Sequence, residues 1–285
     1  MNRQEVFLFL IKIFLFLSLK TDISGFICRM KRYLKAVADI FLPRQCVVCG
    51  RMLLLSERQI CLHCLEDLPR TFFWNQSHNA MADRFNGRIQ EYLCGEDRSA
   101  TGSSVEPYAY AAALFFFHSE AGYRRIPYQI KYHSNLDAGR YFGRMLGSYL
   151  ASSPLYHDLD MVLPVPLHWT RKWKRGYNQA EVIAAAAARA MGKPVRPDIL
   201  FRRRRTKTQT KVGVEDKCRN VEGAFGITDD ARSSLAAMSG LRHLLIVDDV
   251  FTTGSTLFAC FVALRAVFPP SVRISVATLG FVGGR

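Results

Sequence analysis

A run of aliphatic residues that ends in two adjacent aspartates constrains the fold of this chain most strongly. Residues 244–256 read LLIVDDVFTTGST. An unbroken aliphatic run is typical of a strand that is buried on both faces, as in a parallel sheet covered by helices. The small residues after it let the backbone turn tightly and direct its N–H groups toward an anion where the next helix begins. The segment therefore predicts a strand, an anion-binding loop and a helix, in that order.

The polar side chains of this segment predict a phosphate and metal site. Asp248 and Asp249 can accept hydrogen bonds from ribose hydroxyls, or bind the magnesium that accompanies pyrophosphate. The expected phosphate loop consists of Thr252, Thr253, Gly254, Ser255 and Thr256. The 13 residues resemble, at every position, the signature with which type I phosphoribosyltransferases bind 5-phosphoribosyl-1-pyrophosphate (PRPP). The alternative is a buried strand before a Ser/Thr-capped helix, with the two acids in an ordinary loop.

Strand and helix patterns alternate along the C-terminal part of the chain. Strand patterns occur at 108–117, 160–166, 199–201, 224–227 and 271–279, and helical patterns at 120–132, 135–151, 178–191 and 255–267. This alternation predicts an α/β domain with a parallel sheet, helices on both faces and the site at the carboxyl ends of the strands. We expect the domain to span residues 107–285, after a polar linker at 75–106.

Four of the eight cysteines form two close pairs ahead of the linker. Cys46 and Cys49 form the first CxxC pair, and Cys61 and Cys64 form the second. Four thiolates directed at one centre make a closed tetrahedral zinc site, which stabilises a fold and performs no chemistry. We predict a double zinc-ribbon-like module over residues 30–74, with structural zinc favoured over free thiols or a redox pair.

The first residues are apolar but too short for a clear membrane anchor. The apolar run at 6–19 is broken by Lys12 and lacks a small-residue cleavage site, whereas a span needs ~20 apolar residues. One interpretation of residues 1–29 is a signal peptide or anchor. We favour another, in which translation starts at Met30. We therefore expect no stable membrane span and a cytoplasmic location, which the absence of a disulfide pattern also favours.

The net charge of +15, from 39 Lys and Arg against 24 Asp and Glu, favours polyanionic partners. Part of this charge lies in the segment PLHWTRKWKRGYNQ, which follows the strand pattern at 160–166. Arg175 and Gly176 directly precede a helix that Asn178 can cap, so this loop is suited to hold pyrophosphate. Three aromatic residues in the same segment could stack on single-stranded nucleic acid, or pack against the sheet. They are Trp169, Trp173 and Tyr177.

A polar segment that follows the four arginines at 202–205 is a candidate flap. Gln209, Arg219 and Asn220 lie in this segment, which is too polar for a protein core. A mobile flap of this kind can close over a substrate and exclude water.

The chain also resembles one specific family over roughly residues 30–280. The cysteine module, IKYHSNLDAGRYFG at 130–143, VPLHWTRKWKRGYNQ, the flap pattern and DDVFTTGST occur in the order typical of the ComF family of competence-associated, phosphoribosyltransferase-like proteins. The resemblance implies a type I phosphoribosyltransferase fold with an N-terminal zinc-finger module. It places Lys131, Arg175 and Gly176 at the pyrophosphate, Asp248 and Asp249 at the ribose and metal, and residues 252–256 at the 5′-phosphate of PRPP.

Two functions are compatible with these features. The first is a phosphoribosyltransferase (a glycosyltransferase) that binds PRPP with magnesium and transfers phosphoribosyl to an unknown acceptor in nucleoside or nucleotide metabolism. Positioning and neutralisation of the leaving pyrophosphate would then carry most of the catalysis. The second is a factor that handles single-stranded DNA in competence (DNA uptake), with a competence helicase as a candidate partner and no turnover. DNA binding should weaken steeply with salt, whereas pocket binding should depend on magnesium.

Overall fold

The computed structural model describes residues 44–95, 105–117, 122–167, 170, 173, 175–203, 223–228, 230, 232 and 240–283. Several sequence predictions lie outside the described residues: those for residues 1–43, including the start at Met30, those for Trp169, and the flap residues Gln209, Arg219 and Asn220. Among the described residues, no helix combines the length and hydropathy that crossing a membrane requires.

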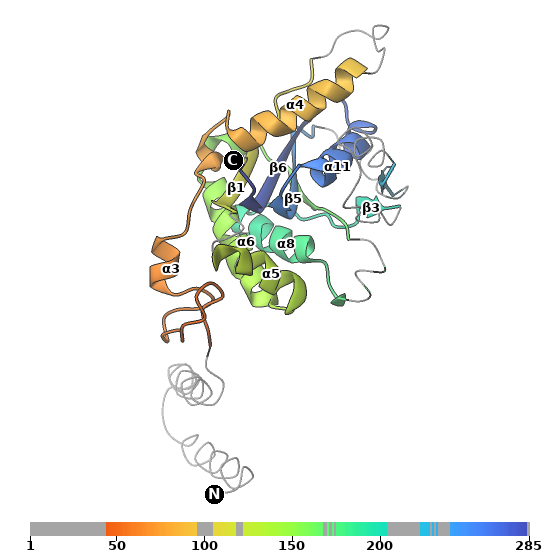
Figure 1. Cartoon of the computed structure of the whole chain (residues 1–285). Helices are drawn as coiled ribbons and strands as arrows, with labels where there is room; N and C mark the ends of the chain where they lie inside the picture. The colour runs from red at the N-terminus through yellow and green to blue at the C-terminus, as the bar shows by residue number, and fades with distance from the viewer. Residues whose placement is uncertain are drawn as a thin grey trace, which may run out of the picture. The chain divides into compact units, whose positions relative to one another are not determined.

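Four parallel strands form the centre of the α/β part of the chain (Figure 1). In sheet order they are β1 (Ala111–Phe116), β6 (Arg273–Phe281), β5 (His243–Phe251) and β2 (Met161–Pro164). Each neighbouring pair is parallel. Residues 244–247 of β5 are all fully buried, as an aliphatic run covered on both faces requires. The predicted parallel α/β sheet is confirmed, and the finer assignment to the type I phosphoribosyltransferase fold stays a prediction.

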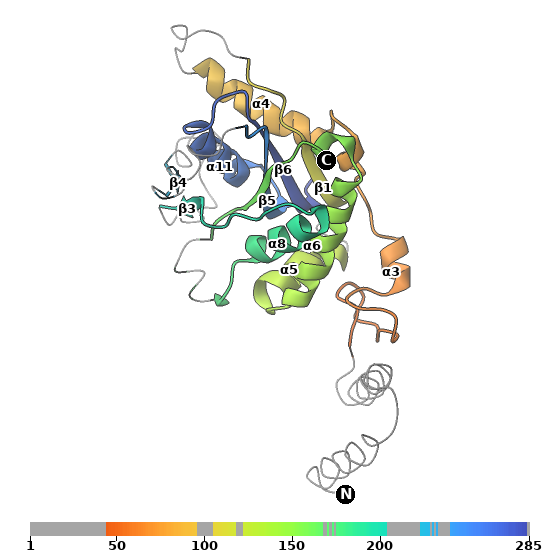
Figure 2. The same ribbon diagram turned by 180° about the vertical axis from the view of Figure 1, so that it is seen from behind.

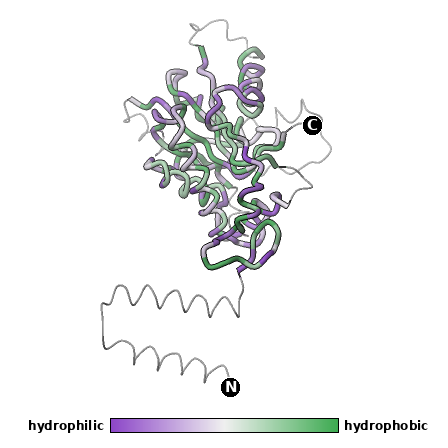
Figure 3. Tube along the Cα trace, turned by 90° about the vertical axis from the view of Figure 1, so that its left-hand side faces the viewer, coloured by the Kyte–Doolittle hydropathy of each residue, from purple (hydrophilic) through white to green (hydrophobic). Residues whose placement is uncertain are grey.

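Helices cover both faces of this sheet (Figures 1 and 2). One face carries α5 (Arg125–Tyr132), α6 (Leu136–Ala151) and α8 (Gln179–Met191), and the other carries α4 (Ala80–Gly95) and α11 (Ser255–Arg265). Hydrophobic residues concentrate along the central strands (Figure 3). The helices add buried apolar residues to the core, among them Leu146 of α6, Ile183 of α8 and Phe261 of α11.

The ends of α8 follow from its sequence. The side chain of Asn178 accepts a hydrogen bond from the N–H of Ala180 at 3.1 Å, which caps the first turn as expected. Gly192 ends the helix in the left-handed region, with φ 65°, where glycine pays no Cβ penalty. These two signals give the helix nearly the bounds predicted from the sequence.

Part of the segment predicted as a linker forms helix α4 instead of a loop. Met81, Phe85 and Ile89 recur on one side of this helix and are fully buried. Asn86 is also buried, because its side-chain amide bonds both the C=O and the N–H of Ala109, at 2.8 and 2.9 Å. The polar composition of this segment indicated a linker. Polar side chains such as Asn86 can be buried in a helix only because the folded chain supplies their hydrogen-bond partners, which the local sequence does not reveal.

The remaining elements are short. β3 (Leu200–Arg202) and β4 (Phe225–Ile227) form a separate antiparallel pair outside the parallel sheet. The other helical turns are α3 (Leu62–Glu66), η1 (Phe73–Asn75), η2 (Gly122–Arg124) and η3 (Pro154–Tyr156). The sequence predicted both short strands but not that they pair with each other away from the sheet.

Candidate functional site

The four paired cysteines converge on one centre. The Sγ atoms of Cys46, Cys49, Cys61 and Cys64 all lie within 4.8 Å of one another, and three of these residues are buried. Tetrahedral Zn–S bonds of about 2.3 Å place sulfur atoms about 3.8 Å apart, so this set fits a structural zinc ion. None of the four forms a disulfide, and the N–H of Cys61 donates to Cys46 Sγ at 3.4 Å. The cluster is therefore able to bind structural zinc.

Asp248 and Asp249 lie near the carboxyl end of β5, where the sequence predicted the anion and metal site. Asp249 is buried, and its Oδ2 lies 2.8 Å from Nζ of Lys131 on α5. Its N–H donates to Asp248 Oδ1 at 2.8 Å. Burial, followed by the neighbouring Asp249 carboxylate, raises the pKa of Asp248 to about 7. The repulsion between the two carboxylates, which Lys131 and Arg202 offset only in part, favours a proton, a cation or a hydrogen-bonding ligand at this site.

The predicted phosphate loop forms the turn from β5 into α11. Gly254 has φ 75°, and a Cβ added to it would lie 2.5 Å from the buried ring of Phe251. Only glycine is accommodated without displacing that ring. Thr253 Oγ1 lies 2.9 Å from Ser255 Oγ, and Thr253 is exposed. Hydroxyls and the first N–H groups of an 11-residue helix thus meet at one loop, as an anion site requires.

The basic loop before α8 contacts the helix that carries Lys131. Arg175 Nη1 donates to Gln179 Oε1 at 3.0 Å, and its guanidinium lies 5.2 Å from the ring centroid of Tyr132 on α5. The Tyr177 hydroxyl donates to the carbonyl of Ile130 on the same helix. Arg175 and Lys131, predicted to act together, therefore both lie on or against α5. Their contact with pyrophosphate stays a prediction.

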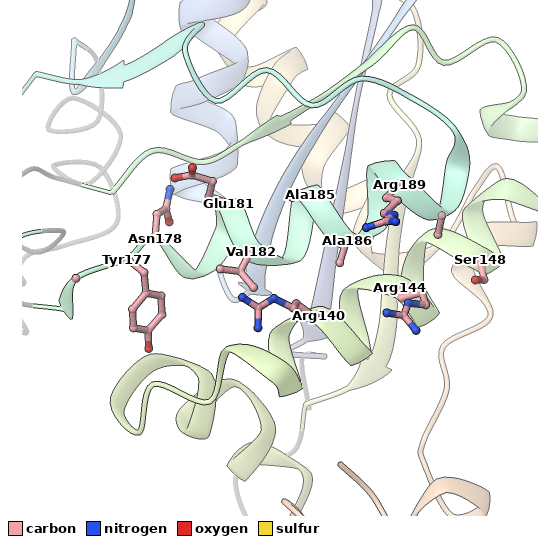
Figure 4. A pocket seen from close by; sticks show the side chains of 12 residues that line it. Arg140, Arg144, Ser148, Tyr177, Asn178, Glu181, Val182, Ala185, Ala186 and Arg189 are labelled. Carbon is pink, nitrogen blue, oxygen red and sulfur yellow. The ribbon is translucent and has the colours of Figure 1, made fainter. Parts of the chain in front are cut away.

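Sequence analysis missed a basic cleft on the outer side of the helix layer. It has a volume of about 940 Å³ and lies between α6 and α8 (Figure 4). Arg140, Arg144 and Arg189 are among the residues that line it. The available signal was the spacing of the first two arginines, because residues four apart lie on the same side of a helix.

The exposed aromatic residues were only partly anticipated. Trp173 is 87% exposed, so its indole does not pack against the sheet. Tyr128 and Tyr132 on α5 are also more than half exposed, and their ring centroids lie 4.9 Å apart. Their i, i+4 spacing was the sequence signal for this pair.

Comparison with known proteins gives matches named for competence and DNA utilization. The chain is 25% identical to Competence protein F of Haemophilus influenzae over 243 residues, which cover 82% of this chain and 96% of that protein. It is 35% identical over 98 residues to DNA utilization protein YhgH of Shigella flexneri and of Salmonella typhi, covering 34% of this chain and 40% of each relative. No family model matches the chain.

Proposed function

This chain belongs to the ComF family, and we propose that it handles single-stranded DNA during DNA uptake. The observation that carries this proposal is the similarity to Competence protein F, which extends over 96% of that protein. The second group of relatives, named for DNA utilization, supports the same class of substrate. A competence helicase as partner stays a prediction.

The charge and the exposed aromatic residues support this function. The net charge of +15 favours a polyanion, because neutralising phosphates releases their counterions. Single strands bind where basic side chains lie near exposed aromatic rings on which bases stack. Tyr128, Tyr132 and Trp173 are such rings, and Arg175 lies against Tyr132. A duplex offers no unstacked bases to these rings, so we expect a preference for single strands.

Competition between single and double strands tests this function. A fluorescein-labelled single-stranded oligonucleotide is bound by the wild-type protein, and fluorescence anisotropy reports its displacement by unlabelled single strand or duplex. We expect the single strand to compete at a lower nucleotide concentration than the duplex. Equal competition by both would remove the preference for single strands, and absence of binding at low salt would overturn the function itself.

The acidic pair beside Lys131 favours a second candidate function, a site for PRPP. Carboxylate oxygens at 248 and 249 suit magnesium, which when bound would offset the charge of the pyrophosphate. The side chains and backbone of the protein would bind the other parts of PRPP. Asp249 and Asp248 would accept hydrogen bonds from the ribose hydroxyls, the loop at 252–256 would bind the 5′-phosphate, and Arg175 would lie toward the pyrophosphate. In a transfer reaction, an acceptor nucleophile would form a bond to the anomeric carbon of the ribose as the bond to pyrophosphate breaks, and the pyrophosphate would leave with its charge offset by Arg175.

Calorimetric titration with PRPP tests the second candidate. We expect binding that requires magnesium in the wild type and disappears in the Asp248→Asn/Asp249→Asn variant. The matched control is Asp137→Asn/Asp198→Asn, which removes the same charge at exposed positions. Loss of binding in the control, or no binding by the wild type, would contradict a PRPP site.

A further inference from the structure

We propose that the cleft between α6 and α8 is the groove in which the backbone of single-stranded DNA lies. This proposal rests on the proposed function, and it adds where on the protein the DNA binds and which residues contact it. The groove has a volume of about 940 Å³, and its labelled side chains come from both helices and from the loop before α8 (Figure 4). Neither Asp248 nor Asp249 is among the residues that line it.

Arginines line this groove on both sides. Arg140 and Arg144 come from α6, four residues and therefore about 6 Å of helix rise apart. Arg189 comes from the last turn of α8. Figure 4 shows Arg144 and Arg189 toward one end of the groove and Arg140 nearer its middle. Donors of this kind, repeated along a groove, can contact successive phosphates of one strand.

Close packing of the two helices leaves a shallow floor between these arginines. A Cβ added to Gly147 of α6 would lie 2.4 Å from the carbonyl oxygen of Ala187 in α8, so the two backbones approach directly. On the solvent side, Ala185, Ala186 and Ala190 of α8 line the groove with small side chains. The long arginine side chains therefore stand above a floor that leaves room for a chain of phosphates and sugars.

The charge of the groove is positive. Glu181 is the single carboxylate among its lining residues, against the three arginines. Arg140 also pairs with Asp137 at 2.8 Å, but both side chains are more than half exposed. An exposed pair contributes little net stability, so a phosphate can replace the carboxylate as the partner of Arg140. Charge complementarity thus selects a polyanion as the occupant.

One end of the groove is continuous with the exposed aromatic residues. Gly176 and Tyr177 line that end, and the Tyr177 hydroxyl donates to the carbonyl of Ile130 in α5. The next residues outward are Arg175 and, against its guanidinium, Tyr132. A strand that leaves the groove at this end meets rings on which its bases can stack. The acidic side chains of a peptide have no aromatic face that could stack on these rings, whereas the bases of a strand do. We therefore assign the groove to a nucleic acid strand.

A charge-matched pair of triple variants tests the groove. Arg140→Gln/Arg144→Gln/Arg189→Gln removes the groove arginines, and Arg51→Gln/Arg88→Gln/Arg242→Gln removes the same charge elsewhere. Anisotropy titrations with a labelled single-stranded oligonucleotide give the slope of log affinity against log salt concentration. In the groove variant this slope should be less negative by about 2, since each lost phosphate contact accounts for about 0.7. The control variant should stay close to wild type.

A second variant guards against misfolding of the first. Ala185 is exposed in the groove, so Ala185→Glu adds a carboxylate without disturbing the core, and Gln90→Glu on α4 adds the same charge outside the groove. We expect weaker DNA binding by Ala185→Glu than by Gln90→Glu, with both variants keeping the wild-type circular dichroism spectrum.

The outcomes separate this inference from the proposed function. If the wild type binds single strands and the groove variants match their controls, the groove is not the site although DNA binding stands. If the wild type binds no DNA, the proposed function and the groove assignment both fail. If polyglutamate binds more tightly than the oligonucleotide and the groove variants abolish this, the occupant is an acidic protein segment and the assignment to DNA is overturned.

Discussion

Nζ of Lys131 lies 2.8 Å from Oδ2 of Asp249 and joins helix α5 to the carboxyl end of strand β5. The lysine side chain is 28% exposed, whereas the aspartate side chain is only 5% exposed. The aspartate therefore depends on this lysine for compensation of its charge in the folded chain. The same helix exposes the side chains of Tyr128 and Tyr132, so α5 carries both the lysine of the acidic site and two exposed aromatic residues.

Removal of this lysine should destabilise the protein. Lys131→Met leaves the Asp249 carboxylate buried without its partner, which should lower the free energy of unfolding by about 1–3 kcal/mol. Urea unfolding at pH 7 measures the change. The double variant Lys131→Met/Asp249→Asn should recover part of the loss, because the stranded charge is gone. Equal stability of Lys131→Met and wild type would contradict the pairing.

The raised pKa of Asp248 predicts a pH dependence of stability. Its pKa of about 7 in the folded chain exceeds the unfolded value of about 3.9, so the folded state holds this proton more tightly. The contribution of Asp248 to the free energy of unfolding is therefore largest below pH 4, and it is lost as the pH rises toward 7. Asp248→Asn should therefore gain stability relative to wild type between pH 5 and pH 8 in urea unfolding. A constant difference between the two proteins across that range would count against the shift.

His243 should show the opposite dependence. Its ring is fully buried, with Nδ1 2.8 Å from Asp158 Oδ1 and Nε2 2.7 Å from Ser275 Oγ. Burial lowers the pKa of His243, an effect that outweighs the nearby Asp158 carboxylate. The stability this group contributes is present above the unfolded pKa of about 6.5 and is lost as pH falls through the lowered folded pKa.

Comparison with His243→Gln isolates this effect. The difference in urea midpoint between wild type and variant should shrink from pH 7.5 to pH 5, because only the wild type must protonate the buried ring. A difference that widens on acidification would mean that the ring is charged in the folded state.

The cysteine cluster predicts a structural metal. Purified protein should contain close to one zinc ion per chain, and Cys61→Ser should lower both the zinc content and the unfolding temperature. Cys94 is exposed and lies outside the cluster, so Cys94→Ser is the matched control and should keep its zinc. Zinc content by mass spectrometry checks this. Equal zinc in both variants would exclude the cluster as the binding site.

Local sequence signals predicted the parallel sheet and its connection to the acidic loop. The aliphatic run at 244–247 was enough to predict a strand buried on both faces. Asn178 and Gly192 were enough to predict where α8 begins and ends. The two CxxC pairs were enough to predict the cysteine cluster, since each pair places two thiols in one short turn. In each case the prediction depended on a pattern of residues that lie close together in the sequence.

Features that depend on distant contacts were missed. Phe85 of α4 packs edge-on against Phe261 of α11 at 6.0 Å, and this packing makes a helix of a segment whose polar residues indicated a linker. The basic groove exists because Gly147 lets α6 and α8 approach closely. Neither contact partner can be identified from periodicity alone, because the tertiary fold brings them together.

The salt dependence of DNA binding tests the central claim, that this protein handles single-stranded DNA. Anisotropy titrations of the wild type with one labelled oligonucleotide, over a series of potassium chloride concentrations, give the slope of log affinity against log salt. We predict a straight line that falls by about 0.7 for each phosphate contacted, hence a slope of about −2 or steeper for three groove arginines. A slope near zero, or no measurable affinity at low salt, would contradict the claim.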